Sequence, residues 1–204
     1  MRKYVDMKWK NAGEAVAYQI NFHNIFYTYG DVTADYYYSR PTLECWYGGE
    51  QIKDFEMPKG NVRKEYGRLD SCCFAVVDKI RDLLIGRFDD ITEVDFRPVW
   101  TKKHDIPVCW QITPQAIMKP IYELNSWEVE VCEKCGHTQY WYNGIEENTF
   151  CISEEILGEL HGLNRTYETH RNIYDIVVRK DVYEFLSDLY PRMQFKPVFL
   201  RKCT

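Results

Sequence analysis

The chain has 204 residues, and its 26 basic and 31 acidic side chains give it a formal net charge of −5. Hydrophobic residues make up 45% of the sequence and charged residues 28%, which is usual for a globular protein and excludes disordered, collagen-like and coiled-coil chains. Because affinity for nucleic acid depends largely on lysine and arginine, the acidic balance argues against direct nucleic-acid binding and favours a basic partner.

The sequence carries no sign of export or membrane insertion. Its first residues include basic side chains but no apolar stretch of the kind found in signal peptides. The longest apolar run, 72–77, is far shorter than the roughly 20 residues that a membrane-spanning helix needs. We therefore expect a cytoplasmic protein without a membrane partner, whose eight cysteines are reduced and mostly buried.

Aromatic side chains are concentrated in the N-terminal region, 1–70, where ten of them lie between Tyr18 and Tyr47. The region is also rich in threonine and valine, and glycine-containing turn signals divide it into short segments. We expect strands and loops here rather than long helices. Most of the aromatic residues should lie in a core, although tyrosine and tryptophan also anchor protein interfaces.

The chain contains an internal similarity between residues 73–100 and 175–199. Each segment begins with an apolar run, continues with a short amphipathic stretch and ends on phenylalanine, a basic residue, proline, valine and an aromatic residue. We interpret both segments as strand, helix, strand units of one duplicated sequence. Phe96 and Phe195 should then occupy equivalent buried positions, because side chains alternate along a strand.

In the first unit, the apolar run predicts a strand over 74–77, followed by a helix with Asp78 as its N-cap and Gly86 at its end. The buried face of this helix should carry Ile80, Leu83 and Leu84. A second strand is expected over 93–100. Pro98 should lie at an edge or at a strand end, because proline lacks the backbone donor of a sheet ladder.

Two more helices are predicted further along the chain. The second unit should contain a helix that Pro191 stops, and the middle region should contain one that begins after Ser153 and ends near Gly162. Their apolar stripes are Val182, Phe185, Leu186 and Leu189 in the first case, and Ile156, Leu157, Leu160 and Leu163 in the second. The fold class is therefore expected to be α+β. A single domain over 1–204 would contain the two pseudo-repeated units and the aromatic, strand-rich N-terminal region.

The strongest local motif is the run 132–137, which reads Cys-Glu-Lys-Cys-Gly-His. Two cysteines separated by two residues can bind one zinc ion, and the glycine lets the backbone close the turn around it. A closed structural zinc site needs four ligands, so Cys132 and Cys135 form half of a site. The alternative is that these cysteines are ordinary packing residues.

A CxxCG motif followed by a helix, an apolar strand and a terminal Phe-x-Pro-Val resembles the double-CxxCG family of bacterial proteins. That family includes antitoxin or immunity proteins encoded beside secreted polymorphic toxins, and the resemblance extends over about 45–199. Where the family has its first CxxCG, residues 45–49 read Cys-Trp-Tyr-Gly-Gly, with glycine in place of the second cysteine.

The resemblance implies one structural zinc with three surviving family ligands, which are Cys45, Cys132 and Cys135. The candidates for the fourth ligand are His137, Cys109 and Cys151. The alternative is a degenerate site that has lost its metal and keeps the cysteines for packing.

Acidic side chains gather between residues 143 and 170, where six glutamates stand against one arginine. They form either a solvated helix face that complements the helix dipole or a docking surface for a basic protein. If Cys45 approaches Cys132, the aromatic residues beside each would join that surface. The expected partner-binding residues are Glu146, Glu147, Glu154, Glu155, Glu159, Tyr140, Trp141, Tyr142, Trp46 and Tyr47.

The sequence contains no G-x-S-x-G, P-loop, G-x-G-x-x-G or H-E-x-x-H motif, and its five histidines follow no familiar metal or triad spacing. We therefore expect no catalytic residues and a protein that is not an enzyme. The resemblance implies a cytoplasmic immunity protein that binds and neutralises a cognate polymorphic toxin with a basic surface. The alternative is a zinc-ribbon-containing regulatory or nucleic-acid-associated module built on Cys132 and Cys135.

Overall fold

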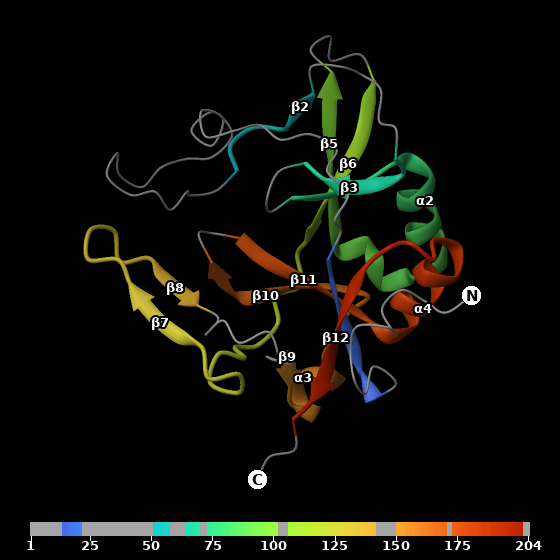
Figure 1. Ribbon diagram of the computed structural model, residues 1–204. Coiled ribbons are helices and arrows are strands. Elements are labelled where there is room, and N and C mark those ends of the chain that lie inside the picture. The colour runs from blue at the N-terminus through green and yellow to red at the C-terminus, as the bar shows by residue number, and fades with distance from the viewer. Residues whose placement is uncertain are drawn as a thin grey trace.

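The computed structural model describes residues 14–21, 51–57, 64–69, 73–101, 106–141, 150–170 and 173–201. These residues form two five-stranded sheets, a two-stranded hairpin, three α-helices and a 3-10 helix (Figure 1). The fold is therefore α+β, as the sequence predicts, and strands dominate it.

The first sheet has the strand order β10-β11-β1-β12-β9. Its strands are β1 (Ala17–Ile20), β9 (Phe150–Ile152), β10 (Leu163–His170), β11 (Ile173–Arg179) and β12 (Phe195–Leu200). Helix α3 (Glu154–Gly158) lies between β9 and β10 in the chain, and helix α4 (Lys180–Leu189) connects β11 to β12. This sheet therefore joins an N-terminal strand to four strands from the last third of the chain.

The second sheet has the strand order β2-β5-β6-β4-β3. Its strands are β2 (Glu56–Met57), β3 (Tyr66–Arg68), β4 (Phe74–Val76), β5 (Val94–Thr101) and β6 (Pro107–Pro114). Helix α2 (Asp78–Arg87) and the 3-10 helix η4 (Asp89–Glu93) connect β4 to β5.

The two sheets have the same topology. In each, a helix connects two strands that run in the same direction, β4 to β5 through α2 and β11 to β12 through α4. A central strand antiparallel to both lies between them, β6 in one sheet and β1 in the other. The outer strands also correspond, because β3 and β10 are antiparallel to their neighbours whereas β2 and β9 are parallel to theirs.

The central strands also match in register. Tyr18 of β1 pairs with Pro197 of β12, and Trp110 of β6 pairs with Pro98 of β5. The next residue in each central strand is a buried glutamine. Each proline thus belongs to the Phe-basic-Pro-Val ending of its unit and faces an aromatic residue of the central strand.

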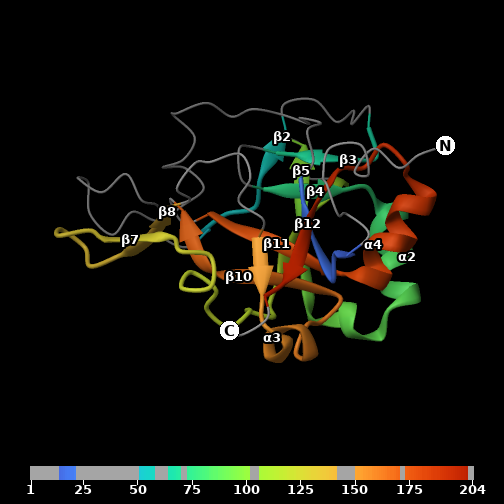
Figure 2. The ribbon, with the colours of Figure 1, turned by 60° about the horizontal axis from the view of Figure 1, so that its bottom comes forward.

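The main hydrophobic core joins both sheets and two helices. Helices α2 and α4 lie side by side in both views (Figures 1 and 2), and Phe88 after α2 contacts Phe185 of α4 with ring centroids 5.5 Å apart. Tyr18 stacks on Tyr183 of α4 at a centroid distance of 3.5 Å. The same cluster includes buried residues of β4, β5, β6, β11 and β12, so the two sheets share one apolar interior.

Helix α2 differs from the prediction at both ends. Val77 is the N-cap, with an extended backbone, and Asp78 is the first helical residue. The carboxylate of Asp78 accepts a hydrogen bond from the indole of Trp110 on β6, which is a tertiary contact that local sequence does not indicate. Gly86 lies inside the helix, which ends at Arg87.

Strand β5 is not an edge strand, although Pro98 favoured that position. It lies between β2 and β6, but β2 pairs only with Trp100 and Thr101. Pro98 therefore lies beyond the end of β2 within the described residues, so its missing donor does not interrupt the pairing of β5 with β2.

The helix that follows Ser153 is shorter than predicted. Ser153 caps it as expected, because its Oγ accepts a hydrogen bond from the amide of Ile156 at 3.3 Å, but the helix ends at Gly158. Leu160 is buried beyond the helix, and Leu163 already begins β10. The apolar stripe continues across a turn into a strand, and spacing alone does not reveal that change.

Helix α4 agrees with the prediction, since it ends at Leu189 and Tyr190 is its C-cap, directly before Pro191. With ten residues each, α2 and α4 are the longest helices of the described chain. No helix in this part of the chain is long and apolar enough to cross a membrane.

Candidate functional site

The CxxCG motif forms the turn of a hairpin between β7 (Glu128–Val131) and β8 (Thr138–Trp141). The amide of Cys132 donates to the carbonyl of His137 at 2.9 Å, and the amide of Gly136 donates to the carbonyl of Cys132 at 2.8 Å. Gly136 has a φ of 70°, which is a left-handed conformation that favours glycine. Cys132 and Cys135 therefore share one tight turn, as the motif predicts.

Other ligands for a metal do not gather at this turn within the described ranges. Cys45 lies outside the described residues, and no group of three or more histidine, cysteine, aspartate or glutamate side chains there could hold a metal ion. His137 and Cys151 therefore do not join the motif cysteines in such a group. Cys109 is buried in β6, and burial raises its pKa to about 12, so its thiol stays protonated at neutral pH.

Three of the predicted partner-binding residues lie on α3 or directly after it. Glu154, Glu155 and Glu159 are exposed, and Lys119 places its Nζ 2.6 Å from a carboxylate oxygen of both Glu155 and Glu159. The hydrogen bond from Lys119 lowers the pKa of Glu155, and the bonds to both carboxylates raise the pKa of Lys119. Three carboxylates against one ammonium leave this surface acidic.

Tyr140 and Trp141, two of the predicted partner-binding residues, are less exposed than an open aromatic surface implies. Tyr140 is only 9% exposed and packs in a core cluster, where its ring lies 6.3 Å from that of Tyr167. Trp141 is half-buried, and its indole donates to Glu130 of the neighbouring strand at 2.9 Å. Side chains alternate along β8, so only one of these two residues can face away from the core.

Glu168, which contributes to the acidic count between 143 and 170, is not part of that surface. Its side chain is 3% exposed, and one oxygen accepts hydrogen bonds from the amides of Ile121 and Tyr122. Burial raises the pKa of this carboxyl. Glu168 therefore holds the segment after β6 against β10 instead of facing a partner.

The remaining predicted partner-binding residues lie outside the described residues: Trp46, Tyr47, Tyr142, Glu146 and Glu147. Helix α3 and the turn of the β7–β8 hairpin lie apart in both ribbon views, with the hairpin projecting to the left and α3 at the bottom (Figures 1 and 2). The structure therefore does not bring the motif cysteines and the α3 carboxylates onto one surface.

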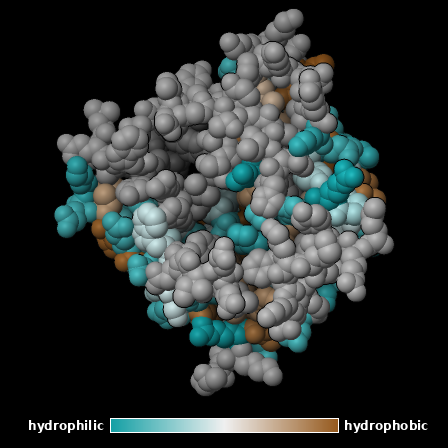
Figure 3. Space-filling model, in the orientation of Figure 1, coloured by the Kyte–Doolittle hydropathy of each residue, from teal (hydrophilic) through white to brown (hydrophobic). Residues whose placement is uncertain are grey.

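The hairpin presents a mixed surface of its own. Val129 and Val131 of β7 are 48% and 58% exposed, and Glu128 and Glu130 alternate with them. Figure 3 shows hydrophilic and hydrophobic residues side by side on this projecting part of the molecule.

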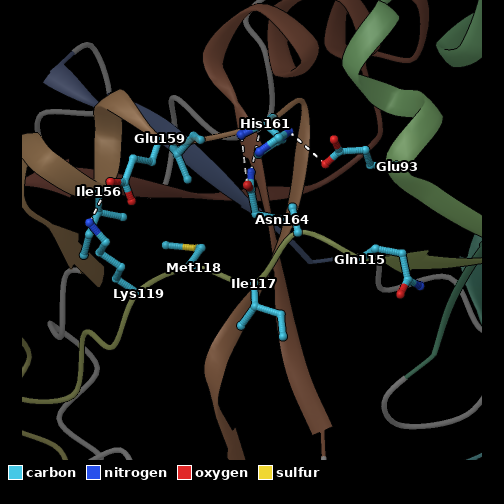
Figure 4. Close-up of a pocket in the computed structure, with 11 residues that line it drawn as sticks. Glu93, Gln115, Ile117, Met118, Lys119, Ile156, Glu159, His161 and Asn164 are labelled. Atoms are coloured by element: carbon cyan, nitrogen blue, oxygen red, sulfur yellow. Dashed lines mark hydrogen bonds and ion pairs between the residues drawn. The ribbon is translucent and has the colours of Figure 1, made fainter.

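A cavity of about 680 Å³ lies beside α3 (Figure 4). Its lining residues come from three distant parts of the sequence: Glu93, Gln115, Ala116, Ile117, Met118, Lys119, Ile156, Glu159, Leu160, His161 and Asn164. The sequence provided no signal for this cavity, because only the packing of the two sheets brings these segments together.

One polar cluster forms part of the cavity wall, and a second lies outside the lining. Asn164 accepts from the amide of His161 at 2.9 Å and donates to its carbonyl at 2.8 Å, which fixes the turn before β10. The imidazole Nδ1 of His161 then lies 3.1 Å from a carboxylate oxygen of Glu93. Nearby, Asp90 of η4 accepts from the amide of Gly162 at 2.8 Å and from Arg179 at 2.6 Å, so it ties the second sheet to the first.

Comparisons with known proteins add no assignment: neither a scan against models of protein families nor a search of curated proteins found a match for this chain.

Proposed function

We propose that the protein is an immunity protein, or antitoxin, that acts in the cytoplasm. It binds a cognate bacterial polymorphic toxin and neutralises it through a protein–protein interface, without catalysis. The proposal is supported by the resemblance of the CxxCG and Phe-x-Pro-Val motifs to the double-CxxCG family, and by the net charge of −5.

The observation that carries this proposal is the group of exposed carboxylates at α3. Glu154, Glu155 and Glu159 offer negative charge to a basic surface, and the single cation among them, Lys119, neutralises only part of it. A toxin that acts on nucleic acid needs a basic cleft, and opposite charge on an inhibitor raises the association rate and the specificity of binding.

The experiment measures binding to the protein encoded immediately upstream, together with protection of cells that express it. In the test variant, Glu154, Glu155 and Glu159 are all replaced by Lys. Lys119→Glu is added to the same variant. Without it, the introduced lysines would repel the ammonium of Lys119, which Glu155 and Glu159 hold in the unmodified protein. We expect association to slow about tenfold or more at low salt, with weaker protection.

A matched control makes the same change in net charge elsewhere. Glu128→Lys and Glu133→Lys alter two exposed glutamates of the hairpin and should leave association unchanged. If the α3 variant associates as fast as the unmodified protein, α3 is not the docking surface. If the unmodified protein neither binds the upstream protein nor protects cells, the immunity function itself is wrong.

We also propose that Cys132 and Cys135 hold one structural zinc together with Cys45. The support is the tight turn around Gly136, which is the backbone shape that a zinc knuckle requires. The same turn favours the second candidate function, a zinc-ribbon-containing regulatory or nucleic-acid-associated module.

The charge of the hairpin separates the two candidates. Glu128, Glu130 and Glu133 stand against Lys134, a balance that disfavours contact with phosphates. The second candidate requires full zinc occupancy and no toxin partner, so metal analysis combined with the binding experiment distinguishes them.

Finally, we propose that the two strand, helix, strand units are pseudo-repeats that arose by duplication. Three features support this: the shared Phe-basic-Pro-Val ending, the matching order of strands in the two sheets, and the matching register against the central strands. Two unrelated units can share an order of strands, but they would share the pairing register as well far less often.

A further inference from the structure

The cavity beside α3 combines an apolar floor with carboxylates on two sides. Met118, Ile156 and Leu160 are buried, with 5%, 5% and 8% of their surface exposed. The side chains of Glu93 and Glu159 are 55% and 54% exposed. Figure 4 shows these two glutamates on opposite sides of the cavity with Met118 between them.

The protein already places one cation at this wall. Lys119 lines the cavity, and its ammonium lies 2.6 Å from a carboxylate oxygen of both Glu155 and Glu159. An amphipathic cation therefore suits the site, because its aliphatic stem can cover apolar surface while its head reaches the carboxylates.

An anion does not suit the cavity. Among the described lining residues, Lys119 is the one permanent cation, and two carboxylates already hold it. The other basic group, His161, faces Glu93. An anionic ligand would have to approach Glu93 and Glu159 without a free positive partner, which costs electrostatic energy.

We propose that this cavity receives an arginine side chain of the partner protein; this rests on the proposed immunity function. Arginine carries five donors in a planar fork, which lets one guanidinium approach Glu93 or Glu159 while its methylenes lie on Met118 and Leu160. A volume of about 680 Å³ is within the range of about 300–1,000 Å³ that is typical of ligand pockets. Arginine in a desolvated pocket is also a common anchor of protein interfaces.

The test is independent of the toxin and uses butylguanidinium as the probe, with neutral butylurea as its isostere. The full-length protein carries labelled methionine methyl groups, and the two compounds are titrated while the Met118 methyl signal is followed by NMR. Butylguanidinium should shift that signal saturably, and butylurea should bind about tenfold more weakly, because it lacks the charge. Equal binding of both compounds, or no saturable shift, overturns the proposal.

Variants identify the groups that hold the probe. Glu93→Gln combined with Glu159→Gln should weaken butylguanidinium binding about tenfold, since it removes both rim carboxylates. The matched pair Glu128→Gln and Glu184→Gln alters two exposed glutamates that lie outside the lining and should change nothing. The charge of Lys119 opposes the probe, so Lys119→Met should strengthen binding, and weaker binding by that variant contradicts the proposal.

The toxin measurement separates this proposal from the function on which it rests. Met118→Trp fills the cavity without changing charge, and it should weaken binding of the upstream protein if an arginine enters there. Unchanged binding of that protein by Met118→Trp removes the cavity as an anchor and leaves the immunity function intact. A failure of the unmodified chain to bind the upstream protein removes the function, whatever the probe does.

A second inference comes from the sheets and is independent of the cavity. The central strands have similar sequences: residues 16–20 read Val-Ala-Tyr-Gln-Ile and residues 108–112 read Val-Cys-Trp-Gln-Ile. Gln19 lies opposite Lys196 and Gln111 opposite Arg97, which are the basic residues of the two Phe-basic-Pro-Val endings. Each of the two similar units, 73–100 and 175–199, is thus preceded in the chain by a strand of similar sequence.

The chain order of these strands crosses between the sheets. Strand β1 precedes β2 to β5, yet it completes the sheet of β9 to β12. Strand β6 precedes β7 to β12, yet it completes the sheet of β2 to β5. We infer that the protein consists of two tandem halves, β1 to β5 and β6 to β12, that have exchanged their first strands, so that neither sheet is complete without the other half.

A cut between the halves tests this arrangement. A protease recognition sequence is inserted after Lys103, between β5 and β6, and the folded full-length chain is cut there. The two pieces should elute together, and after denaturation and separation neither should recover its native circular dichroism alone, whereas a mixture should. The uncut chain with the same insertion is the control for reversible refolding.

Two results would contradict the exchange. Recovery of the native spectrum by either separated piece would show that its sheet forms without the borrowed strand. A mixture that fails to refold, while the uncut control refolds, would show that the pieces do not complete each other.

Discussion

At the scale of single residues, Gly162 lies in close contact with η4. A Cβ atom built there would lie 3.0 Å from an oxygen of Asp90 and 3.0 Å from the terminal carbon of Ile91. Ile91 is fully buried, so it has little room to move. The amide of Gly162 also donates to Asp90, which in turn binds Arg179.

We therefore expect Gly162→Ala to lower the free energy of unfolding by about 1–3 kcal/mol, because the methyl group overpacks the contact with η4. Gly158→Ala is the matched control, since nothing lies within 4 Å of its added Cβ, and it should have little effect. Urea denaturation of both variants measures the difference. Equal free energies of unfolding for the two variants would show that η4 can shift to accommodate the methyl group at little cost.

Glu168 supports a prediction about pH. Its carboxyl is buried and its pKa is raised by that burial, so the folded state binds this proton more readily than the unfolded state does. The stability that this protonation supplies is present below the unfolded pKa of about 4.3 and is lost as pH rises through the folded value. Glu168→Gln removes this titration, so its stability relative to the unmodified protein should rise between pH 4 and pH 7 in thermal melts.

Glu168→Leu separates the charge of this residue from its hydrogen bonds. Glutamine keeps an oxygen that accepts from the amides of Ile121 and Tyr122, whereas leucine leaves both the buried donor of Ile121 and the partly buried donor of Tyr122 without it. The leucine variant should be less stable than the glutamine variant by about 1–3 kcal/mol for each donor left unpaired. Equal melting temperatures for the two variants would mean that the hydrogen bonds contribute nothing.

At the scale of elements, the β7–β8 hairpin carries the prediction about metal. If its turn holds half of a zinc site, purified protein should contain about one zinc per chain, and Cys132→Ser should release it and lower the melting temperature. Removal of zinc by a chelator should lower the melting temperature of the unmodified protein but not that of the variant. Cys109→Ser is a useful contrast, because that buried thiol lies in β6, away from the turn, and its replacement should leave zinc content unchanged.

At the scale of the whole molecule, the equivalent phenylalanines show that the two sheets are alike in register but not in burial. Phe96 lies opposite Ile112 and Phe195 opposite Ile20, which are equivalent places beside the central strands. Phe195 is only 2% exposed, whereas Phe96 is partly buried at the edge of the same core. Phe96 is therefore less buried than the prediction of equivalent buried positions implied, although its place beside the central strand matches that of Phe195.

This difference predicts unequal costs of truncation. Phe195→Ala should lower the free energy of unfolding by about 3–5 kcal/mol, as expected for a fully buried aromatic residue. Phe96→Ala should cost only about 1–2 kcal/mol, because its ring already contacts solvent. Chemical denaturation of both variants provides the comparison, and equal losses would contradict the difference in burial.

Local sequence determined the features that depend on neighbouring residues. Ser153 caps α3 through a hydrogen bond three residues away, Pro191 ends α4, and Gly136 closes the CxxCG turn. The apolar periodicity of the two units was enough to predict that a helix connects two strands in each unit. A helix or strand forms largely from the pattern of its own side chains.

Only the tertiary structure decided which strand fills the centre of each sheet, which side chains are exposed and where a cavity opens. Tyr140 belongs to the core and Glu168 binds backbone amides, although both lie in segments whose composition suggested an exposed surface. The cavity joins Glu93 to Glu159 across 66 positions of the sequence. Burial and strand pairing depend on residues that are distant in the chain, and no local pattern of charge or hydrophobicity contains that information.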